Sequence, residues 1–450
     1  MKTKKLVALV LVVLMLCAVF AGCAKEAAPA SSETGTGTEK PANVTEPAAS
    51  GEPISVIWWC TWAADQPRGA ILREAAAAFN AENPGIVVEV EHSGNYEDTA
   101  NKIEAAVVAK STPALAVVEE TFVGRFNPVA ADISKYISPE TLDNYVDGLL
   151  KSCYVDGVLK SVPFNRSTTI LYMNKTLFEQ AGLPVEGPKT WDELEQYANT
   201  IAAMGDDLYG YALYWDTDGW FWESAIYSWG EEIFNEDYTE LLFNTEDSLK
   251  MIDMAQRMAD SGVMVNPYVT QGTYEDIALE PFMSGKVGML MDSIANFTNH
   301  ATALEEVGME VALAFQPMGT EHSMTTGGGS IIMFDGISEE QKVAAGKFLE
   351  FLASDDFSSR FCELTGYLPV TETSMETDLV KEILTKYPTY QVMFDQLQYA
   401  HGRPLTPNWR GVYNILTEEL EACLQDTSLE PKVAIQNAYD RSMEFLKKSQ

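Results

Sequence analysis

Ile54-Ser55-Val56-Ile57-Trp58-Trp59 is a run of β-branched and aromatic residues, which predicts a buried strand. Residues 68–80 follow with apolar side chains at helical spacing, and Asn83-Pro84-Gly85 marks the end of that helix. Residues 86–90, Ile-Val-Val-Glu-Val, then predict a second strand. A strand, a helix and another strand in this order indicate a parallel βαβ unit, because parallel neighbours need a crossover connection.

The same alternation continues along the chain, which predicts an α/β protein with doubly wound sheets. A helical pattern at 96–110 leads to an apolar run at 114–118. The later strand-like runs and helical patterns are the runs at 169–173, 286–291, 311–315 and 330–334, the helices at 191–204 and 339–353, and two amphipathic helices at 411–424 and 431–448.

Length and charge limit the possible functions. The 450 residues are 46% hydrophobic and 21% charged, enough for two cores of roughly 150–200 residues each. Asp and Glu number 66 against 30 Lys and Arg, which gives a formal net charge of −36. This balance excludes nucleic acid as a partner, because duplex binding relies on Lys and Arg that neutralise phosphates.

Sequence motifs of catalysis and metal binding are missing. The six cysteines form no Cys-x-x-Cys pair, and the four histidines form no His-Glu-x-x-His motif. No Gly-x-Ser-x-Gly or phosphate-loop motif occurs. Asp216-Thr217-Asp218-Gly219 resembles the start of a calcium loop but lacks its later glycine and glutamate, so we interpret it as a turn. We predict no catalytic residue, no metal and no cofactor.

The first 52 residues predict export and a lipid anchor. Three lysines precede an apolar run from Leu6 to Ala21, which is short for a bilayer span and typical of an export signal. The run ends in Phe20-Ala21-Gly22-Cys23, which resembles the lipobox of bacterial lipoproteins. That resemblance implies a signal peptide at 1–22 and acylation of Cys23. Residues 23–52 have almost no large apolar side chain and predict a disordered tether. An uncleaved membrane anchor and an ordinary signal cleavage are the alternatives.

Five motifs, in one order along the chain, resemble a known family. They are Phe79-Asn80-Ala81-Glu82-Asn83-Pro84, Pro163-Phe164-Asn165-Arg166-Ser167-Thr168 with Leu171-Tyr172-Met173-Asn174-Lys175, Thr190-Trp191-Asp192-Glu193-Leu194, Gly327-Gly328-Gly329-Ser330, and Thr365-Gly366-Tyr367-Leu368-Pro369. From residue 54 onward the chain resembles the extracellular solute-binding proteins of ABC importers, in the sugar-type family that contains the glycerol-3-phosphate binders.

The resemblance implies two α/β lobes with a ligand cleft between them and a hinge that the chain crosses three times. The crossings would lie near 164–167, 327–330 and 366–369, where Gly, Pro or short polar residues let φ and ψ change. The first lobe would contain residues 53–164 and 327–365, and the second lobe residues 165–326 and 366–450. Such a protein closes around its ligand and docks on a membrane permease.

Aromatic residues gather in two places. Nine of the 21 residues from 209 to 229 are aromatic, including Trp215, Trp220, Trp222 and Trp229, and Trp58, Trp59 and Trp62 end the first predicted strand. Flat apolar rings suit the C–H faces of a sugar, whose hydroxyls are held by Asp, Glu, Asn and Ser. We predict that two or three of these seven tryptophans line the cleft, with Trp59 as one candidate. For any single ring, a place in the core is the alternative.

The glycerol-3-phosphate branch implies ligand contacts position by position. Its contact residues match Tyr96, Glu120, Ser167, Trp220, Gly328 and Tyr367, with Glu119 one place from the acidic match. That branch also holds phosphate with a C-terminal arginine, but an ungapped comparison puts neither Arg403 nor Arg410 on that position. We take Arg410 as the candidate, with Arg166 as a further one, because guanidinium groups grip anions. Surface ion pairs are the alternative for all three arginines.

These observations predict a monomeric substrate-binding component of an ABC importer, attached to the outer face of the cytoplasmic membrane only through its lipid. Its ligand would be a sugar, an oligosaccharide or a glycerol phosphate, which it passes unchanged to the permease. The alternatives are an exported glycoside hydrolase, which also uses aromatic rings and paired carboxylates, and a cell-surface carbohydrate-binding protein without a transport role.

Overall fold

The computed structural model describes residues 52–213, 220–266 and 278–449. The predicted signal peptide, Cys23, nearly all of the tether, Trp215 and the turn at 216–219 lie outside these ranges. The strands are β1 (Ile54–Cys60), β2 (Ile86–His92), β3 (Leu115–Glu119), β4 (Tyr154–Val155), β5 (Val158–Leu159), β6 (Ser161–Asn174), β7 (Tyr209–Ala212), β8 (Met264–Val265), β9 (Val287–Ser293), β10 (Val311–Ala314), β11 (Met324–Met333) and β12 (Ala400–His401).

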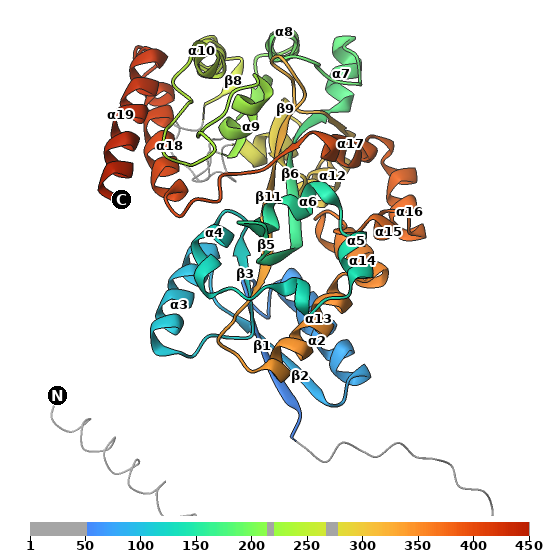
Figure 1. Cartoon of the computed structure of the whole chain (residues 1–450). Helices are drawn as coiled ribbons and strands as arrows, with labels where there is room; N and C mark the ends of the chain where they lie inside the picture. Colours follow the sequence, from blue (N-terminus) through green and yellow to red (C-terminus); the bar gives the residue numbers. More distant parts are fainter. Residues whose placement is uncertain (1–51, 214–219, 267–277, 450) are drawn as a thin grey trace, which may run out of the picture. The chain divides into compact units, whose positions relative to one another are not determined.

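Helices occupy most of the remaining described chain (Figure 1). They are α2 (Pro67–Glu82), α3 (Tyr96–Ala109), α4 (Phe122–Phe126), α5 (Pro139–Asn144), α6 (Asp147–Leu150), α7 (Lys175–Ala181), α8 (Trp191–Ala202), α9 (Trp220–Ser228), α10 (Glu246–Asp260), α11 (Glu280–Met283), α12 (Phe297–Glu306), α13 (Glu339–Leu352), α14 (Asp355–Thr365), α15 (Glu372–Met375), α16 (Asp378–Lys386), α17 (Gln391–Asp395), α18 (Trp409–Gln425) and α19 (Pro431–Ser449). Within the described ranges, none has the length and apolar composition that a bilayer crossing requires.

The first βαβ unit forms as the sequence predicts. Strands β1 and β2 are parallel, with Ile54 opposite Ile86, and β3 joins β1 on its other side in the same direction. The Asn80 side chain bonds both backbone groups of Val88, at 2.8 and 3.1 Å, and so ties the end of α2 to β2. Helix α3 begins with a capping box between Asn95 and Asp98, which fixes the position of the neighbouring Tyr96.

Two long strands join the parts of the sheet, whose order is β2-β1-β3-β11-β6-β9-β7-β8. The predicted run at 169–173 is only a portion of β6, which begins at Ser161, and the run at 330–334 covers only the last residues of β11, which extends from Met324 to Met333. The extra residues include Asn165, Arg166 and a glycine run, which do not resemble a buried strand in sequence. Strand β6 runs antiparallel to β9, β10 and β11, and β11 runs antiparallel to β3 and β6 but parallel to the short β12, so the sheet is mixed rather than purely parallel.

Strands β6 and β11 divide the sheet into two lobes. The first lobe contains β2, β1 and β3 with the adjoining parts of β11 and β6, and the second contains the rest of β6 with β9, β10, β7 and β8. Helices α8, α9, α10, α18 and α19 pack in one core with the second lobe's strands. Helices α2, α13 and α14 pack against the first lobe.

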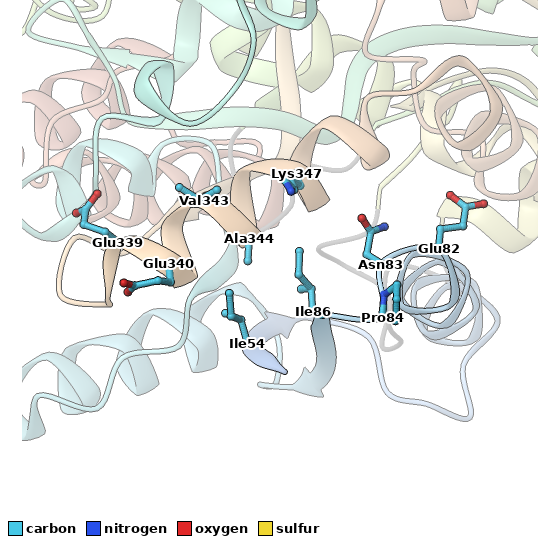
Figure 2. Close-up of a pocket in the computed structure, with 11 residues that line it drawn as sticks. Ile54, Glu82, Asn83, Pro84, Ile86, Glu339, Glu340, Val343, Ala344 and Lys347 are labelled. Carbon is cyan, nitrogen blue, oxygen red and sulfur yellow. The ribbon is translucent and has the colours of Figure 1, made fainter. Parts of the chain in front are cut away.

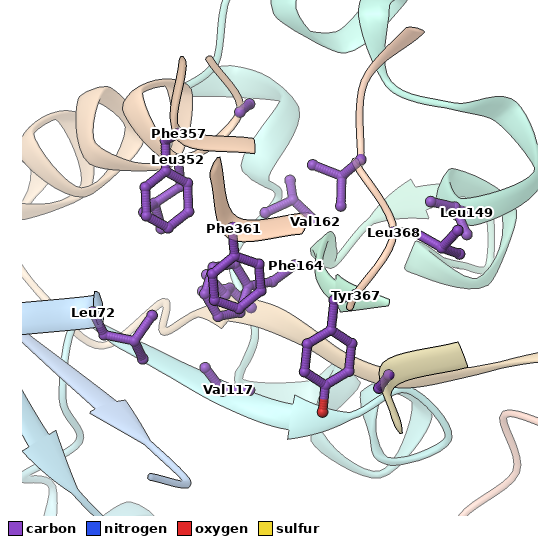
Figure 3. Packing of buried hydrophobic residues seen from close by; sticks show 14 of the residues in the cluster. Leu72, Val117, Leu149, Val162, Phe164, Leu352, Phe357, Phe361, Tyr367 and Leu368 are labelled. Carbon is purple, nitrogen blue, oxygen red and sulfur yellow. The ribbon is translucent and has the colours of Figure 1, made fainter. Parts of the chain in front are cut away.

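An aromatic stack fills the core of the first lobe near the sheet (Figure 3). The Phe164 ring lies 5.1 Å from Phe361, and Phe361 stacks on Tyr367 at 5.9 Å with an interplanar angle of 8°. Phe164 belongs to β6, whereas Phe361 belongs to α14 and Tyr367 follows that helix. This packing holds residues 366–369, the third predicted crossing, against the first crossing at 164–167.

Candidate functional site

The three predicted crossing segments meet at Arg166. Arg166 pairs with Gly328 in the β6–β11 register, and its carbonyl accepts the backbone N–H of Leu368 at 2.8 Å. Gly328 has φ of +84°, and a Cβ there would overlap the Asn165 carbonyl oxygen. Only glycine therefore fits this close crossing of backbones. The predicted residue Ser167 is buried in the same place, opposite Gly327.

A buried ion pair lies directly beneath this crossing. Glu120 and Arg166 have fully buried side chains and form a salt bridge. The Arg166 guanidinium also donates to the hydroxyls of Thr326 at 2.8 Å, Ser152 at 3.1 Å and Ser330 at 3.2 Å. Glu120 thus neutralises a cation inside the protein, and the ion pair uses two of the charged residues that the sequence offered as ligand contacts.

A second group of charges joins the two lobes. Arg403 Nη1 lies 2.7 Å from Glu119 Oε1 at the end of β3, and Arg403 Nε lies 3.0 Å from Glu223 Oε2 on α9. The side chains of Arg403 and Glu223 are almost completely buried, and that of Glu119 is 11% exposed. Burial raises the pKa of Glu223, although the Arg403 guanidinium acts in the opposite direction. We call Glu119, Glu120, Arg166, Glu223 and Arg403 the charge cluster.

Tyr96 reaches the same crossing from the first lobe. Its hydroxyl accepts a hydrogen bond from Asn165 Nδ2 at 2.7 Å, and it would lie 3.1 Å from a Cβ at position 329. Burial raises the pKa of Tyr96 well above its ordinary value, so the phenol stays protonated. The side-chain amide oxygen of Asn165, Oδ1, is buried and has no protein hydrogen-bond partner among the described residues. It is an acceptor that a ligand hydroxyl can satisfy.

Trp220 approaches from the second lobe. Its indole N–H donates to the carbonyl of Thr326 at 3.0 Å, and a Cβ at position 327 would overlap its ring. Trp220 is only partly buried, whereas Trp58 and Trp222 are fully buried in the two cores. Among the clustered tryptophans that the structure describes, Trp220 is thus the one that the β11 glycines position directly.

Tyr367 lies in a second aromatic group on the first-lobe side. The guanidinium carbon of Arg68 lies 4.8 Å from the Tyr367 ring centroid, and the Trp62 ring lies 5.9 Å from it. Arg68 Nη2 donates to the carbonyls of Ala295 at 3.0 Å and Thr365 at 3.3 Å. This arginine is therefore held by ring and backbone contacts.

Two predicted site residues lie away from the charge cluster. Trp59 is 7% exposed and packs in the core between the first-lobe sheet and α3, and its indole N–H donates to Glu91 at 2.9 Å. Arg410 Nε lies 3.0 Å from Glu97 Oε1, and its guanidinium lies over the Tyr413 ring. The Arg410–Glu97 pair is partly exposed and links α18 to α3.

Sequence reasoning missed Glu223 and Asn165. Glu223 is the one charged residue of α9. A carboxylate in so apolar a helix requires a buried partner, and that signal could have pointed to the site. Asn165 gave no such signal, because the sequence alone does not reveal that it faces Tyr96.

A separate, mostly apolar hollow lies where β1, β2 and α13 begin (Figure 2). Its volume is about 610 Å³, and its lining includes Ile54, Ile86 and Val343. It contains none of the predicted site residues. Its few polar groups lie on exposed turns and helix ends, so it lacks the converging polar side chains of a solute site.

The comparisons with known proteins identify the family. A family of bacterial extracellular solute-binding proteins matches residues 74–389. The chain belongs to this family. The predicted resemblance and the general function of an extracellular solute-binding protein are thereby confirmed. Other proteins of this kind include the sn-glycerol-3-phosphate-binding periplasmic protein UgpB of Escherichia coli, which is 29% identical over 403 residues covering 83% of this chain and 88% of its own length.

Solved structures of solute-binding proteins have the same fold. A cyclic α-maltosyl-1,6-maltose binding protein from Arthrobacter globiformis is 24% identical with a TM-score of 0.75, covering 88% of this chain and 100% of that one. UgpB from Mycobacterium tuberculosis, in complex with glycerophosphocholine, is 20% identical with a TM-score of 0.74, covering 89% and 100%. The predicted two-lobed α/β fold is therefore confirmed.

Proposed function

We propose that this solute-binding protein captures a neutral sugar or oligosaccharide outside the membrane and delivers it to the permease of an ABC importer. The observation that carries the choice of ligand is the pairing of the arginines. Arg166, Arg403 and Arg410 each already face a carboxylate, and the charge cluster contains three carboxylates against two guanidinium groups. A phosphate would have to displace one of these carboxylates, whereas a hydroxyl can donate to it.

The geometry supplies both kinds of contact that a sugar needs. Trp220 offers a partly exposed indole beside the β11 glycines, and Tyr96 and Asn165 offer polar atoms across from it. An indole face fits the C–H surface of a sugar ring, and the polar atoms take its hydroxyls. We propose Tyr96, Glu119, Ser167, Trp220, Gly328 and Tyr367 as the surroundings of the ligand.

A glycerol phosphate is the second candidate, and Arg68 favours it. Within the described ranges the partners of its guanidinium are two carbonyls and two aromatic rings, so no carboxylate of these residues has to exchange for a phosphate. The named E. coli relative supports the same ligand class. If this candidate is correct, Arg68→Gln abolishes binding of glycerol 3-phosphate, while Arg410→Gln, which removes an arginine paired with Glu97, leaves it unchanged.

We propose that closure bends the chain where β6 and β11 pass from one lobe to the other. The first lobe then comprises residues 53–164 and 327–365, and the second 165–326 and 366–450. We further propose that the protein is a monomer without catalytic activity, held at the outer face of the cytoplasmic membrane by acylated Cys23 and the tether at 23–52. Palmitate labelling of the wild type, lost in Cys23→Ala, tests the anchor.

Thermal unfolding with a panel of solutes tests the ligand class. The panel contains glucose, maltose, maltotriose, glycerol 3-phosphate and glycerophosphocholine. A ligand that binds only the folded state at 100 times its Kd stabilises it by about 2.7 kcal/mol, so a true ligand is readily detected. We expect stabilisation by one or more saccharides and none by the phosphate esters. Stabilisation by glycerol 3-phosphate alone contradicts the proposal, and hydrolysis of a saccharide at catalytic protein concentration identifies a glycosidase instead.

A further inference from the structure

Arg68 occupies a position that is unfavourable for a cation. It is the second residue of α2, which begins at Pro67, and the positive end of a helix dipole lies at the first turn. Its guanidinium faces two carbonyl oxygens, because Nη2 donates to that of Ala295 at 3.0 Å and to that of Thr365 at 3.3 Å. Thr365 is the last residue of α14, so its carbonyl lies at the negative end of that helix. These two acceptors compensate for the unfavourable place of the charge on α2.

The two acceptors of Arg68 lie in different parts of the molecule. Thr365 ends the first lobe at the third predicted crossing, whereas Ala295 belongs to the second lobe. Arg68 follows the end of β1, and Ala295 follows the end of β9. The contact between the lobes is therefore made at the carboxyl ends of strands, which is the side on which α/β sheets bind ligands. A rotation that opens the cleft on this side separates Arg68 from Ala295.

A buried acid fixes the turn that presents the Ala295 carbonyl. Asp292 accepts hydrogen bonds from the backbone N–H of Ser293 at 2.7 Å and from Asn296 Nδ2 at 2.9 Å. It also lies 2.7 Å from His300 Nε2, and the side chains of both residues are almost completely buried. The Ser293 hydroxyl in turn accepts the backbone N–H of Ala295 at 3.2 Å. The second lobe thus offers an acceptor that is already in place, so little entropy is lost when a donor reaches it.

Two aromatic rings hold the guanidinium from the other side. Its carbon lies 4.8 Å from the Tyr367 ring centroid and 5.9 Å from that of Trp62, distances at which a planar cation is attracted to a ring face. Another arginine of α2 bonds differently, since Arg73 Nη1 donates at 2.8 Å to the carbonyl of Gly69 in the same helix. Helix α2 therefore carries one arginine that reaches the second lobe and one that bonds its own helix.

We propose that Arg68 is a positioning residue that clasps the two lobes together over a bound solute. Its hydrogen bond to the Ala295 carbonyl forms when the lobes meet and breaks when they part, while Thr365 and the two rings keep the guanidinium in place. The inference rests on the proposed closure and not on which solute is bound. Because the clasp forms after the solute has entered, it slows release and leaves entry unchanged. The same hydrogen bond also favours the closed arrangement before any solute binds.

Binding kinetics test the clasp. The wild type, Arg68→Met and the matched control Arg73→Met are mixed with the solute of the thermal-unfolding panel that stabilises the wild type most, and tryptophan fluorescence is followed by stopped flow. Methionine keeps an apolar stem but removes the charge and the donors. We expect Arg68→Met to raise koff at least tenfold with kon within twofold of the wild type, and Arg73→Met to behave as the wild type. In small-angle X-ray scattering without solute, Arg68→Met should have the larger radius of gyration.

The other outcomes separate the clasp from the proposed function. If the wild type binds a panel solute and Arg68→Met leaves koff unchanged, the clasp is refuted and the proposed function stands. If Arg68→Met weakens the phosphate esters and no saccharide, Arg68 is a solute contact and the clasp is wrong. If no panel solute binds, the proposed function fails, and equal radii of gyration then refute the clasp as well. Should Arg68→Met fail to fold, Arg68→Lys keeps the charge but loses the planar fork, and an unchanged koff in that variant also refutes the clasp.

Discussion

Replacing Glu120 with Gln distinguishes a structural role for this residue from a ligand contact. The sequence resemblance predicts that Glu120 touches the ligand, whereas its side chain is fully buried against Arg166. Glu120→Gln would leave the Arg166 charge buried without a counter-ion. Removing one partner of a buried pair destabilises a protein by about 3–5 kcal/mol. Because three hydroxyls also bond the guanidinium, we expect a loss near the lower end, about 3 kcal/mol.

That loss should be visible as a change in melting temperature. With an unfolding entropy of about 2.1 cal/mol/K per residue and about 400 folded residues, a loss of 3 kcal/mol lowers Tm by about 4 °C. Differential scanning calorimetry of the ligand-free protein measures the shift. The control is the double variant Glu120→Leu with Arg166→Met, which removes both charges. It should regain most of the lost stability, because an apolar replacement leaves no unpaired ion.

Ligand affinity supplies the second half of the test. If the buried ion pair is the whole role of Glu120, Glu120→Gln changes the ligand Kd by less than tenfold, since the carboxylate is already bonded to Arg166 and to the hydroxyl of Thr326. A variant that keeps the wild-type Tm within 1 °C but loses binding would refute this reasoning. It would show that Glu120 leaves Arg166 and faces the ligand when the lobes move.

Three further predictions concern the binding surface and the core. Trp220→Ala should weaken ligand binding at least tenfold, about 1.4 kcal/mol, without changing the far-ultraviolet circular dichroism; unchanged affinity in calorimetry would remove this ring from the site. Gly328→Ala should lower Tm by several degrees, because its positive φ and the Asn165 carbonyl leave no room for a Cβ; an unchanged Tm would contradict the tight crossing. Burial raises the pKa of Cys362 to about 12 and that of Cys423 to about 11. At pH 8 neither thiol should therefore react with Ellman's reagent until denaturant is added. Rapid reaction in the native state would contradict their burial.

The sequence predicts local structure well where the pattern itself is local. The strands and helices from Ile54 to Glu119 alternate with clear periodicity, and each forms within two or three residues of its expected place. The hinge portions of β6 and β11 escape such reasoning. Asn165, Arg166 and the glycines beside them are polar or small, and they become strand only because their partners lie in the other crossing segments. Pairing at that distance leaves no periodic signal in either segment.

The site is harder to predict than the fold, because its partners are far apart in the sequence. Arg403 and Glu119 are separated by 284 residues, so nothing near either residue indicates the contact. The tryptophans illustrate a second difficulty. Trp58 and Trp222 are fully buried while Trp220 is not, although all three lie in aromatic runs. Which ring faces a ligand depends on the direction of one side chain on its element, and that follows from packing.

The charge cluster also bears on how a ligand acts on the two lobes. Arg403 contacts Glu119 at the end of β3 and Glu223 on α9, and Arg410 on α18 contacts Glu97 on α3, so both arginines connect elements of different lobes. Moving the lobes apart exposes these charged side chains or separates them from their partners. For the buried pairs of Arg403, this separation has a large electrostatic cost. A ligand can shift such an equilibrium only through contacts that it makes better in one arrangement than in the other. Hydroxyls that donate to Glu119 add to the existing ion pairs, whereas an anion competes with the carboxylates for the same guanidinium. The electrostatics of closure therefore favour an uncharged ligand even where an arginine is within reach.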